Sequence, residues 1–226
     1  MKRLYAIVSC DVVDSTSLTR EGIIKMREDI VNELFRKLRR FAPGFYGRVV
    51  RGDTIEICLD EPNLALRVAL AMKAWFKSWA SAQESSERMS QIGIRYSIGI
   101  GEMRYVDYEE DIMDGEAIYI AGRNLDYISA NGLYSAFGFN YASDEYEIIQ
   151  RLARNLLAFI DDLFEQMTTR QSLVVHYLLL GCKEVEIAGL LSISQAAVSL
   201  RARNAGWALI KASLETFNRI EFERYV

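Results

Sequence analysis

Two aspartates, Asp11 and Asp53, occupy positions from which a pair of carboxylates could hold a divalent metal ion. Asp11 ends an apolar run that is typical of a buried strand, and Asp53 stands at the tip of a predicted hairpin. If these strands are neighbours, the carboxylates meet at one edge of the sheet and share the ion, which would in turn hold a triphosphate. The competing interpretation is local, because aspartates at strand ends and hairpin tips often serve turn geometry alone.

A second group of candidate residues lies near the C-terminus. Residues 188–199 follow the pattern A-x-x-L-x-x-S-x-x-x-V-S, which is typical of a helix-turn-helix. Ser194 is predicted to cap the second helix, and Val198 to pack back onto the first. The residues that we predict to contact DNA in a major groove are Ser194, Gln195, Ala196, Ser199 and Arg203. The alternative is an ordinary pair of antiparallel helices at a domain end.

The rest of the sequence indicates the elements that must position these residues. Apolar runs and alternation predict strands at residues 4–10, 46–50, 55–59, 92–101 and 134–142, and helices at 22–40, from Pro62 onward and at 115–129. This order predicts a ferredoxin-like core of the α+β class, with an antiparallel sheet covered by helices on one face. In such a core the strands that carry Asp11 and Asp53 are neighbours.

From Asp144 onward every segment is typical of a helix. We therefore predict two domains, residues 1–143 and residues 144–226. The second is an all-α helix-turn-helix domain, reached through a linking helix from about Glu145 to Gln166.

Charge is distributed unevenly along a chain whose net charge is −4. Residues 102–116 hold seven acids against one base, and we interpret this run as a solvated loop. From Lys183 onward bases exceed acids by only one. Since phosphate neutralisation supplies much of the affinity for DNA, a lone copy of this unit would bind weakly, and we expect a homodimer.

Other composition features argue against several classes of protein. The three cysteines have no metal-ligand spacing, so buried free thiols in a reducing compartment are expected. The single His176 has no ligand partner nearby and is predicted to be a packed helix residue. The N-terminus lacks a signal pattern and the apolar runs are too short for a membrane span, which predicts a cytoplasmic protein with no membrane partner.

Four blocks of the chain resemble the class III nucleotide cyclase domain, in the same order, over about residues 4–142. They are Asp11–Thr16, Gly52–Asp53, Ser97–Gly101 and Gly115–Arg123. The resemblance implies that Asp11 and Asp53 bind Mg or Mn ions and that Arg123 stabilises the phosphates of a nucleotide. It also places Arg48 beside the position that reads the base.

Two positions depart from the cyclase pattern. The lysine that reads adenine is replaced by Val49, and the asparagine that orients the transition state is replaced by Tyr119, which has no amide. We therefore predict no cyclic product from ATP or GTP. Nearly the whole chain, including the helix-turn-helix, also resembles the SatD family of bacterial proteins, which implies a cyclase-like domain fused to a DNA-binding module.

These observations together predict a DNA-binding regulatory protein. Its N-terminal domain would be a degenerate cyclase-like module that senses a nucleotide or serves as a dimer platform. One alternative is a metal-dependent nucleotide cyclase or a related phosphoryl-transfer enzyme. A second alternative is a protein-interaction module, which the near-neutral charge of the C-terminal unit keeps open.

Overall fold

The computed structural model describes residues 3–51, 53–82, 93–140 and 145–224. Gly52, the polar loop predicted at residues 83–90 and the boundary predicted near Ser143 lie outside the described residues. The strands are β1 (Leu4–Val13), β2 (Tyr46–Arg51), β3 (Thr54–Leu59), β4 (Gly93–Asp107), β5 (Ile112–Gly115) and β6 (Ser135–Phe139). The α-helices are α1 (Arg20–Asp29), α2 (Phe35–Leu38), α3 (Ala65–Ala82), α4 (Glu116–Ala130), α5 (Glu145–Gln166), α6 (Thr169–Leu179), α7 (Glu184–Leu191), α8 (Gln195–Asn204) and α9 (Trp207–Phe217).

The sheet confirms the predicted neighbours. Its order is β2-β3-β1-β4-β5, with β6 also paired to β4, so that β1 lies between β3 and β4. The pairings are antiparallel except for β4 with β6, which is parallel. The predicted helix at residues 22–40 is present but is interrupted by a π-helical turn at Ile30–Leu34, between α1 and α2.

The acidic segment is not the solvated loop that we predicted. The second half of β4 pairs with β5, so most of this segment forms a β-hairpin. The apolar side chains of Met103, Val106 and Met113 pack against the small core cluster that contains Ile7. Acidic residues fill many of the intervening and tip positions. A count of charges in this segment therefore does not reveal that one face of the hairpin is apolar.

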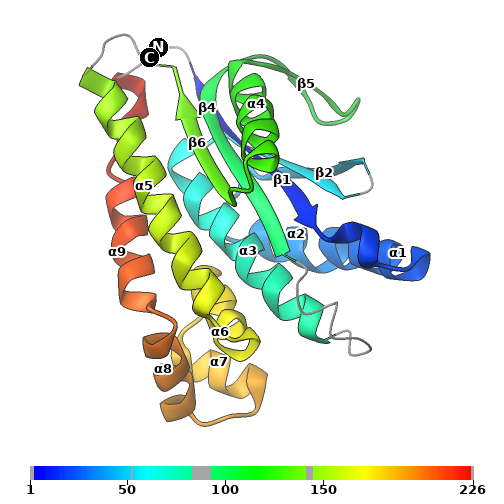
Figure 1. Cartoon of the computed structure of the whole chain (residues 1–226), viewed down its shortest axis with the longest axis vertical. Coiled ribbons are helices and arrows are strands. Elements are labelled where there is room, and N and C mark those ends of the chain that lie inside the picture. The colour runs from blue at the N-terminus through cyan, green and yellow to red at the C-terminus, as the bar shows by residue number, and fades with distance from the viewer. Residues whose placement is uncertain (1–2, 52, 83–92, 141–144, 225–226) are drawn as a thin grey trace.

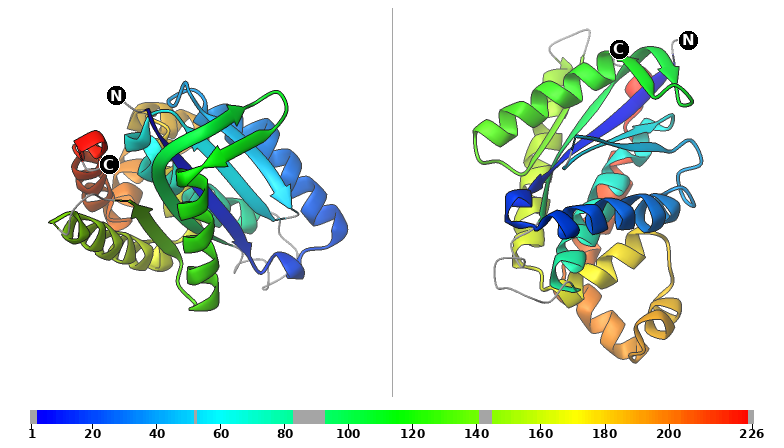
Figure 2. Two further views of the ribbon diagram at one scale, coloured as in Figure 1. Left: turned by 90° about the horizontal axis from the view of Figure 1, so that it is seen from above. Right: turned by 90° about the vertical axis from the view of Figure 1, so that its right-hand side faces the viewer.

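Helices cover both faces of the sheet, not one face as predicted (Figure 2). On β1, Ala6 and Val8 belong to the main core with α1, α2 and α3, whereas Ile7 belongs to the opposite cluster. Ala117 and Ala121 of α4 complete that second cluster. Their small side chains let α4 lie close against β1 and β4 on the face that we expected to be bare.

The C-terminal helices share the main core with the sheet. The Phe137 ring of β6 lies 5.6 Å from that of Phe217 in α9 and 6.1 Å from that of Phe222, between ring centroids. Helix α5 also covers the outer edge of β6, because Gln150 accepts from the Phe139 N–H at 2.9 Å and Arg154 donates to the Phe137 carbonyl at 2.9 Å. The division into two domains stays a prediction, and its two parts share this core.

Helices α7 and α8 lie at one end of the long axis of the molecule, away from both chain termini (Figure 1). No single helix in the described part of the chain has the length and hydropathy of a membrane span. Cys10 and Cys58 are free and buried, as expected, and Cys182 is free and half-buried.

His176 is a packed helix residue, as predicted. Its side chain is 0% exposed, and its Nδ1 lies 2.9 Å from the Ala71 carbonyl oxygen. Burial lowers the pKa of His176 to about 4, although the bond to Ala71 works the other way.

This buried histidine predicts a pH-dependent stability. Between pH about 6.5 and about 4 the unfolded chain binds a proton that the folded chain excludes, so the free energy of unfolding falls as the pH falls through that window. The expected loss is on the order of 2–3 kcal/mol. Urea unfolding at several pH values measures it. His176→Gln should remove this slope, and an unchanged slope in that variant would contradict the assignment.

Candidate functional site

Helices α7 and α8 meet at an angle of 107°. Ser192 ends α7 in a left-handed conformation with φ of 52°, which turns the chain sharply. Ser194 then caps α8, because its side-chain oxygen accepts from the Ala197 N–H at 3.2 Å. The predicted turn and cap are therefore confirmed as local structure.

A small apolar cluster fixes α8 in place. Val198 is 0% exposed and packs with Val174 of α6, Ile187 of α7 and Ala202 of α8. This contact confirms the packing role predicted for Val198. The cluster ties α8 to two other helices, so the outer face of α8 is presented on a rigid support.

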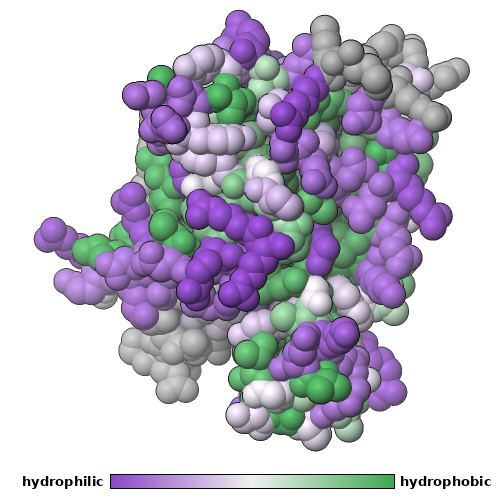
Figure 3. Space-filling view, turned by 180° about the vertical axis from the view of Figure 1, so that it is seen from behind, coloured by the Kyte–Doolittle hydropathy of each residue, from purple (hydrophilic) through white to green (hydrophobic). Residues whose placement is uncertain are grey.

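The predicted DNA-binding residues lie at the N-cap of α8 and on α8 itself. All of them are exposed: Ser194, Gln195, Ala196, Ser199 and Arg203. The side chains of Gln195, Ser199 and Arg203 make no ion pair or hydrogen bond to any other described residue. From behind, this end of the molecule is a lobe whose surface mixes hydrophilic and hydrophobic residues (Figure 3). The arrangement leaves three polar side chains free to meet a partner.

The structure also brings the two candidate metal ligands to one end of β1. Asp11 lies opposite Thr54 in the β1–β3 register, and the Val12 N–H donates to the Asp53 carbonyl at 3.3 Å. Burial raises the pKa of the Asp11 carboxyl, the Arg95 guanidinium lowers it, and the charge of Asp53 raises it further. The convergence of the two carboxylates on one metal ion stays a prediction.

Each carboxylate of this pair already has a polar partner in the fold. Ser15 donates a hydrogen bond from Oγ to Asp53 Oδ2 at 2.6 Å, and Arg95 lies 3.7 Å from Asp11 Oδ2. No group of three or more histidine, cysteine or acidic side chains is arranged for a metal ion in the described ranges. Magnesium needs only one or two carboxylates when water and ligand phosphates supply the other oxygens. A magnesium site at this pair would therefore depend on water and on a phosphate ligand for its other oxygens.

Sequence reasoning missed Arg95 and Ser15 as neighbours of this pair. Arg95 lies directly opposite Asp11 in the β1–β4 register, and its Nη1 donates to Ser129 Oγ at 2.7 Å. Its position could be found only by knowing the strand register. Ser15 lies only four residues after Asp11 in the sequence. This short separation was the signal that could have placed Ser15 near the pair.

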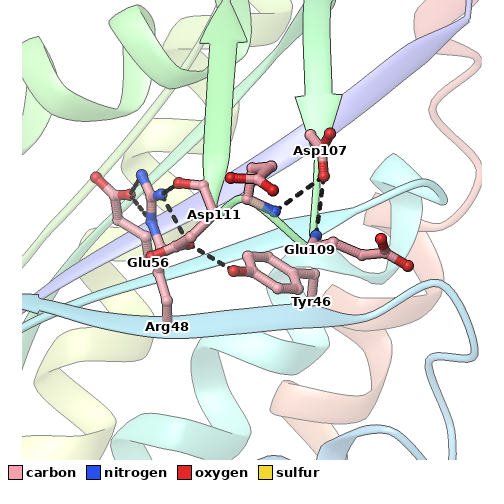
Figure 4. A network of polar contacts seen from close by, with 7 residues as sticks. Tyr46, Arg48, Glu56, Asp107, Glu109 and Asp111 are labelled. Carbon is pink, nitrogen blue, oxygen red and sulfur yellow. Dashed lines mark hydrogen bonds and ion pairs between the residues drawn. The ribbon is translucent and has the colours of Figure 1, made fainter.

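Arg48, predicted to contact a nucleotide, is held by ion pairs inside the fold (Figure 4). Its Nη2 lies 2.6 Å from Glu56, and its Nη1 lies 2.9 Å from Asp111. Burial acts to lower the pKa of the Arg48 guanidinium, but its hydrogen bonds to both acids outweigh burial and raise the pKa. Together with the Tyr46 hydroxyl, which donates to Asp111, Arg48 fastens the β4–β5 hairpin onto β2 and β3.

Arg123 lies elsewhere, in a hollow of about 370 Å³ between α4, β6 and α5. Arg154 and Asn124 line the same hollow. The structure therefore does not gather the predicted nucleotide-binding residues into one site with the carboxylate pair. Tyr119 is also engaged, because its hydroxyl donates to Asp114 and accepts from Arg104.

No family model and no curated protein matches the chain, so the resemblance to the SatD family stays a prediction. Several solved structures are similar in part. An adenylate/guanylate cyclase/hydrolase from Silicibacter pomeroyi is 23% identical, with a TM-score of 0.41 over 56% of this chain and 70% of that one. A bacterial light-regulated adenylyl cyclase is 15% identical, with a TM-score of 0.45 over 61% and 76%.

The adenylyl cyclase CyaB from P. aeruginosa is 14% identical, with a TM-score of 0.43 over 56% of this chain and 73% of that one. These values describe a partial likeness in chain fold. They assign no substrate or ligand to this chain.

Proposed function

We propose that this protein is a regulator that binds DNA through α8. The observation that carries the proposal is the free polar face of α8, presented at one end of the molecule on a helix that crosses α7 at 107°. A helix held in this way has the form needed to enter a major groove. The part before α5 would sense a nucleotide or support dimer formation.

The chemistry of the face suits base edges and phosphates. Gln195, Ser199 and Arg203 are spaced four residues apart, so their side chains lie along one side of α8. Glutamine pairs with adenine, and arginine pairs with guanine or with phosphate. Serine can contact either a base edge or a phosphate. The capped N-terminus of α8 adds a partial positive charge that attracts phosphate.

Replacing Arg203 with alanine is expected to weaken DNA binding by roughly 1–3 kcal/mol, which is about 5- to 150-fold. Gln195→Ala should instead relax the preference at one base pair. A duplex selected from random sequences, titrated at two salt concentrations and followed by fluorescence anisotropy, measures both effects. Arg219→Ala is the matched control, because Arg219 is also exposed but follows α9 rather than lying on α8.

Two results would contradict this proposal. One is a log–log salt slope near zero, which means that no phosphates are engaged. The other is an equal loss of affinity in the Arg203 and Arg219 variants. The first result favours a protein-interaction role for this end, which the exposed Val185 and Leu190 of α7 would suit, with 64% and 60% of their surface exposed. The second would mean that DNA is bound without a special role for α8.

A second candidate function is metal-dependent nucleotide binding, favoured by the position of Asp11 and Asp53 at neighbouring strand ends. A nucleoside triphosphate with Mn²⁺ at 100 times its dissociation constant should stabilise the fold by about 2.7 kcal/mol. This gain corresponds to a melting-temperature rise of roughly 5–10 °C for a chain of this size. Thermal denaturation with and without both ligands measures it.

Asp11→Ala and Asp53→Ala should each abolish this rise, whereas Asp126→Ala, an exposed aspartate on α4, should keep it. An equal rise in all variants would place the ligand elsewhere. Cyclic product formed from ATP or GTP by the wild type, and lost in the Asp11→Ala variant, would instead favour the enzyme alternative.

A further inference from the structure

Helix α5 exposes a row of large apolar side chains that no described element covers. Ile148, Leu152 and Phe159 are 61%, 61% and 73% exposed, although Leu157 and Ile160 on the opposite side are only 2% exposed. Spacings of four and seven residues put the exposed three on one face of the helix. Figures 1 and 2 show α5 on the outside of the molecule.

This face is large enough to require an explanation. Leu156 and Leu163, which are half-buried, border the exposed row along its length. Single exposed apolar residues are ordinary, but a contiguous row marks a surface that binds a partner. We call the row of Ile148, Leu152, Leu156, Phe159 and Leu163 the α5 stripe.

We propose that the α5 stripe binds the α5 stripe of a second copy of this chain, with the two helices antiparallel. Charge complementarity along the helix supports this pairing. Arg151 lies in the first half of α5 with its side chain 74% exposed, and Asp162 and Glu165 are exposed in the second half. The ion pair of Arg151 with Glu147, at 3.9 Å and on the surface, is weak.

Antiparallel pairing centred between Leu156 and Leu157 brings opposite charges together and also buries the apolar side chains of the two stripes. Arg151 of each copy then lies opposite Asp162 of the other, which gives two equivalent ion pairs. Leu152 packs beside Phe159 of the other copy, and the same contact recurs by symmetry. Parallel pairing would instead put Asp162 opposite Asp162, where like charges repel.

The arrangement has a consequence that rests on the proposed function. Because α8 lies beyond the C-terminal end of α5 (Figure 1), antiparallel pairing puts the two α8 helices at opposite ends of the dimer. Such a dimer would hold two separate stretches of duplex rather than two adjacent half-sites. We therefore expect the dimer to bridge two DNA molecules.

Sedimentation equilibrium of the full chain without DNA tests the dimer. The wild type should be a dimer at micromolar concentration, and Phe159→Asp should be a folded monomer, since Phe159 is exposed and the change removes no core contact. Ile24→Asp is the matched control, because Ile24 is 48% exposed but lies on α1. A monomeric wild type, or loss of the dimer in the control alone, overturns the proposal.

Charge exchange and cross-linking test the antiparallel direction. Arg151→Asp and Asp162→Arg should each weaken the dimer, and the double variant should restore it. In a Cys182→Ser background, Asn155→Cys should form a disulfide between copies because it lies near the centre. Ile148→Cys should not, because two such residues would be about 26 Å apart along the axis at about 1.5 Å per residue. Cross-linking at 148 but not at 155 overturns the arrangement.

The dimer interface and the DNA-binding function can each be contradicted without the other. A chain that dimerises but does not bind DNA overturns the proposed function and leaves the interface standing. If Phe159→Asp binds one labelled duplex as well as the wild type but no longer captures a second, the bridging dimer is supported. Capture of a second duplex by the monomeric variant would overturn it.

Discussion

Val198→Asp is expected to unfold the end of the molecule that carries α8. The Val198 side chain is 0% exposed and lies among Val174, Ile187 and Ala202, none of which can hydrogen-bond a carboxylate through its side chain. Burying an unpaired charge there costs more than this small cluster contributes, so we expect a loss on the order of 4 kcal/mol or more. Hydrogen exchange of α7 and α8 amides should become fast.

The neighbouring residue supplies the control for this prediction. Ser199→Asp places the same charge one residue further along α8, at an exposed position, and should leave the fold intact. It should also weaken DNA binding by repelling phosphate. If Val198→Asp melts like the wild type with protected amides in α8, the packing role assigned to Val198 is wrong.

Gly99→Ala is expected to be nearly as damaging, through a different mechanism. A Cβ atom at Gly99 would lie 2.3 Å from the Ala117 carbonyl oxygen and 2.5 Å from the Ala121 nitrogen. Both are backbone atoms of α4, so the whole helix would have to move away from β4. We expect a loss of about 3 kcal/mol or more, measured by chemical denaturation.

Gly122→Ala is the matched control on the facing helix. A Cβ atom there would meet nothing within 4 Å, and alanine is the better helix former. That variant should gain roughly 0.5–1 kcal/mol. Equal stability of the Gly99→Ala variant and the wild type would show that α4 does not lie as close to the sheet as the structure places it.

Local patterns predicted the elements well, because local chemistry determines them. The apolar runs around Ile7 and Ile57 indicated strands, the linking helix expected from about Glu145 to Gln166 is α5, and Ser194 was a recognisable cap. These features depend on residues within a few positions of each other. A single sequence therefore carries enough information to identify them.

Features that depend on distant pairing were missed. The apolar pattern of α4 indicates which of its sides is buried but not which face of the sheet covers that side. Likewise, nothing near Asp11 indicates that Arg95 lies opposite it across the sheet. Arg48 was assigned to a ligand from the cyclase resemblance, and its acid partner in the hairpin, Asp111, becomes a neighbour only when the chain folds back.

The aromatic contacts between β6 and the end of the chain limit how this protein can be divided. Phe137, Phe217 and Phe222 come from segments on both sides of α5, and all three are buried together. A fragment that begins at α5 would expose Phe217 and Phe222 to water, and a fragment that ends before α5 would do the same to Phe137. We therefore expect the segment from α5 onward to be no transferable cassette, and its grafting onto another protein should fail unless the sheet travels with it.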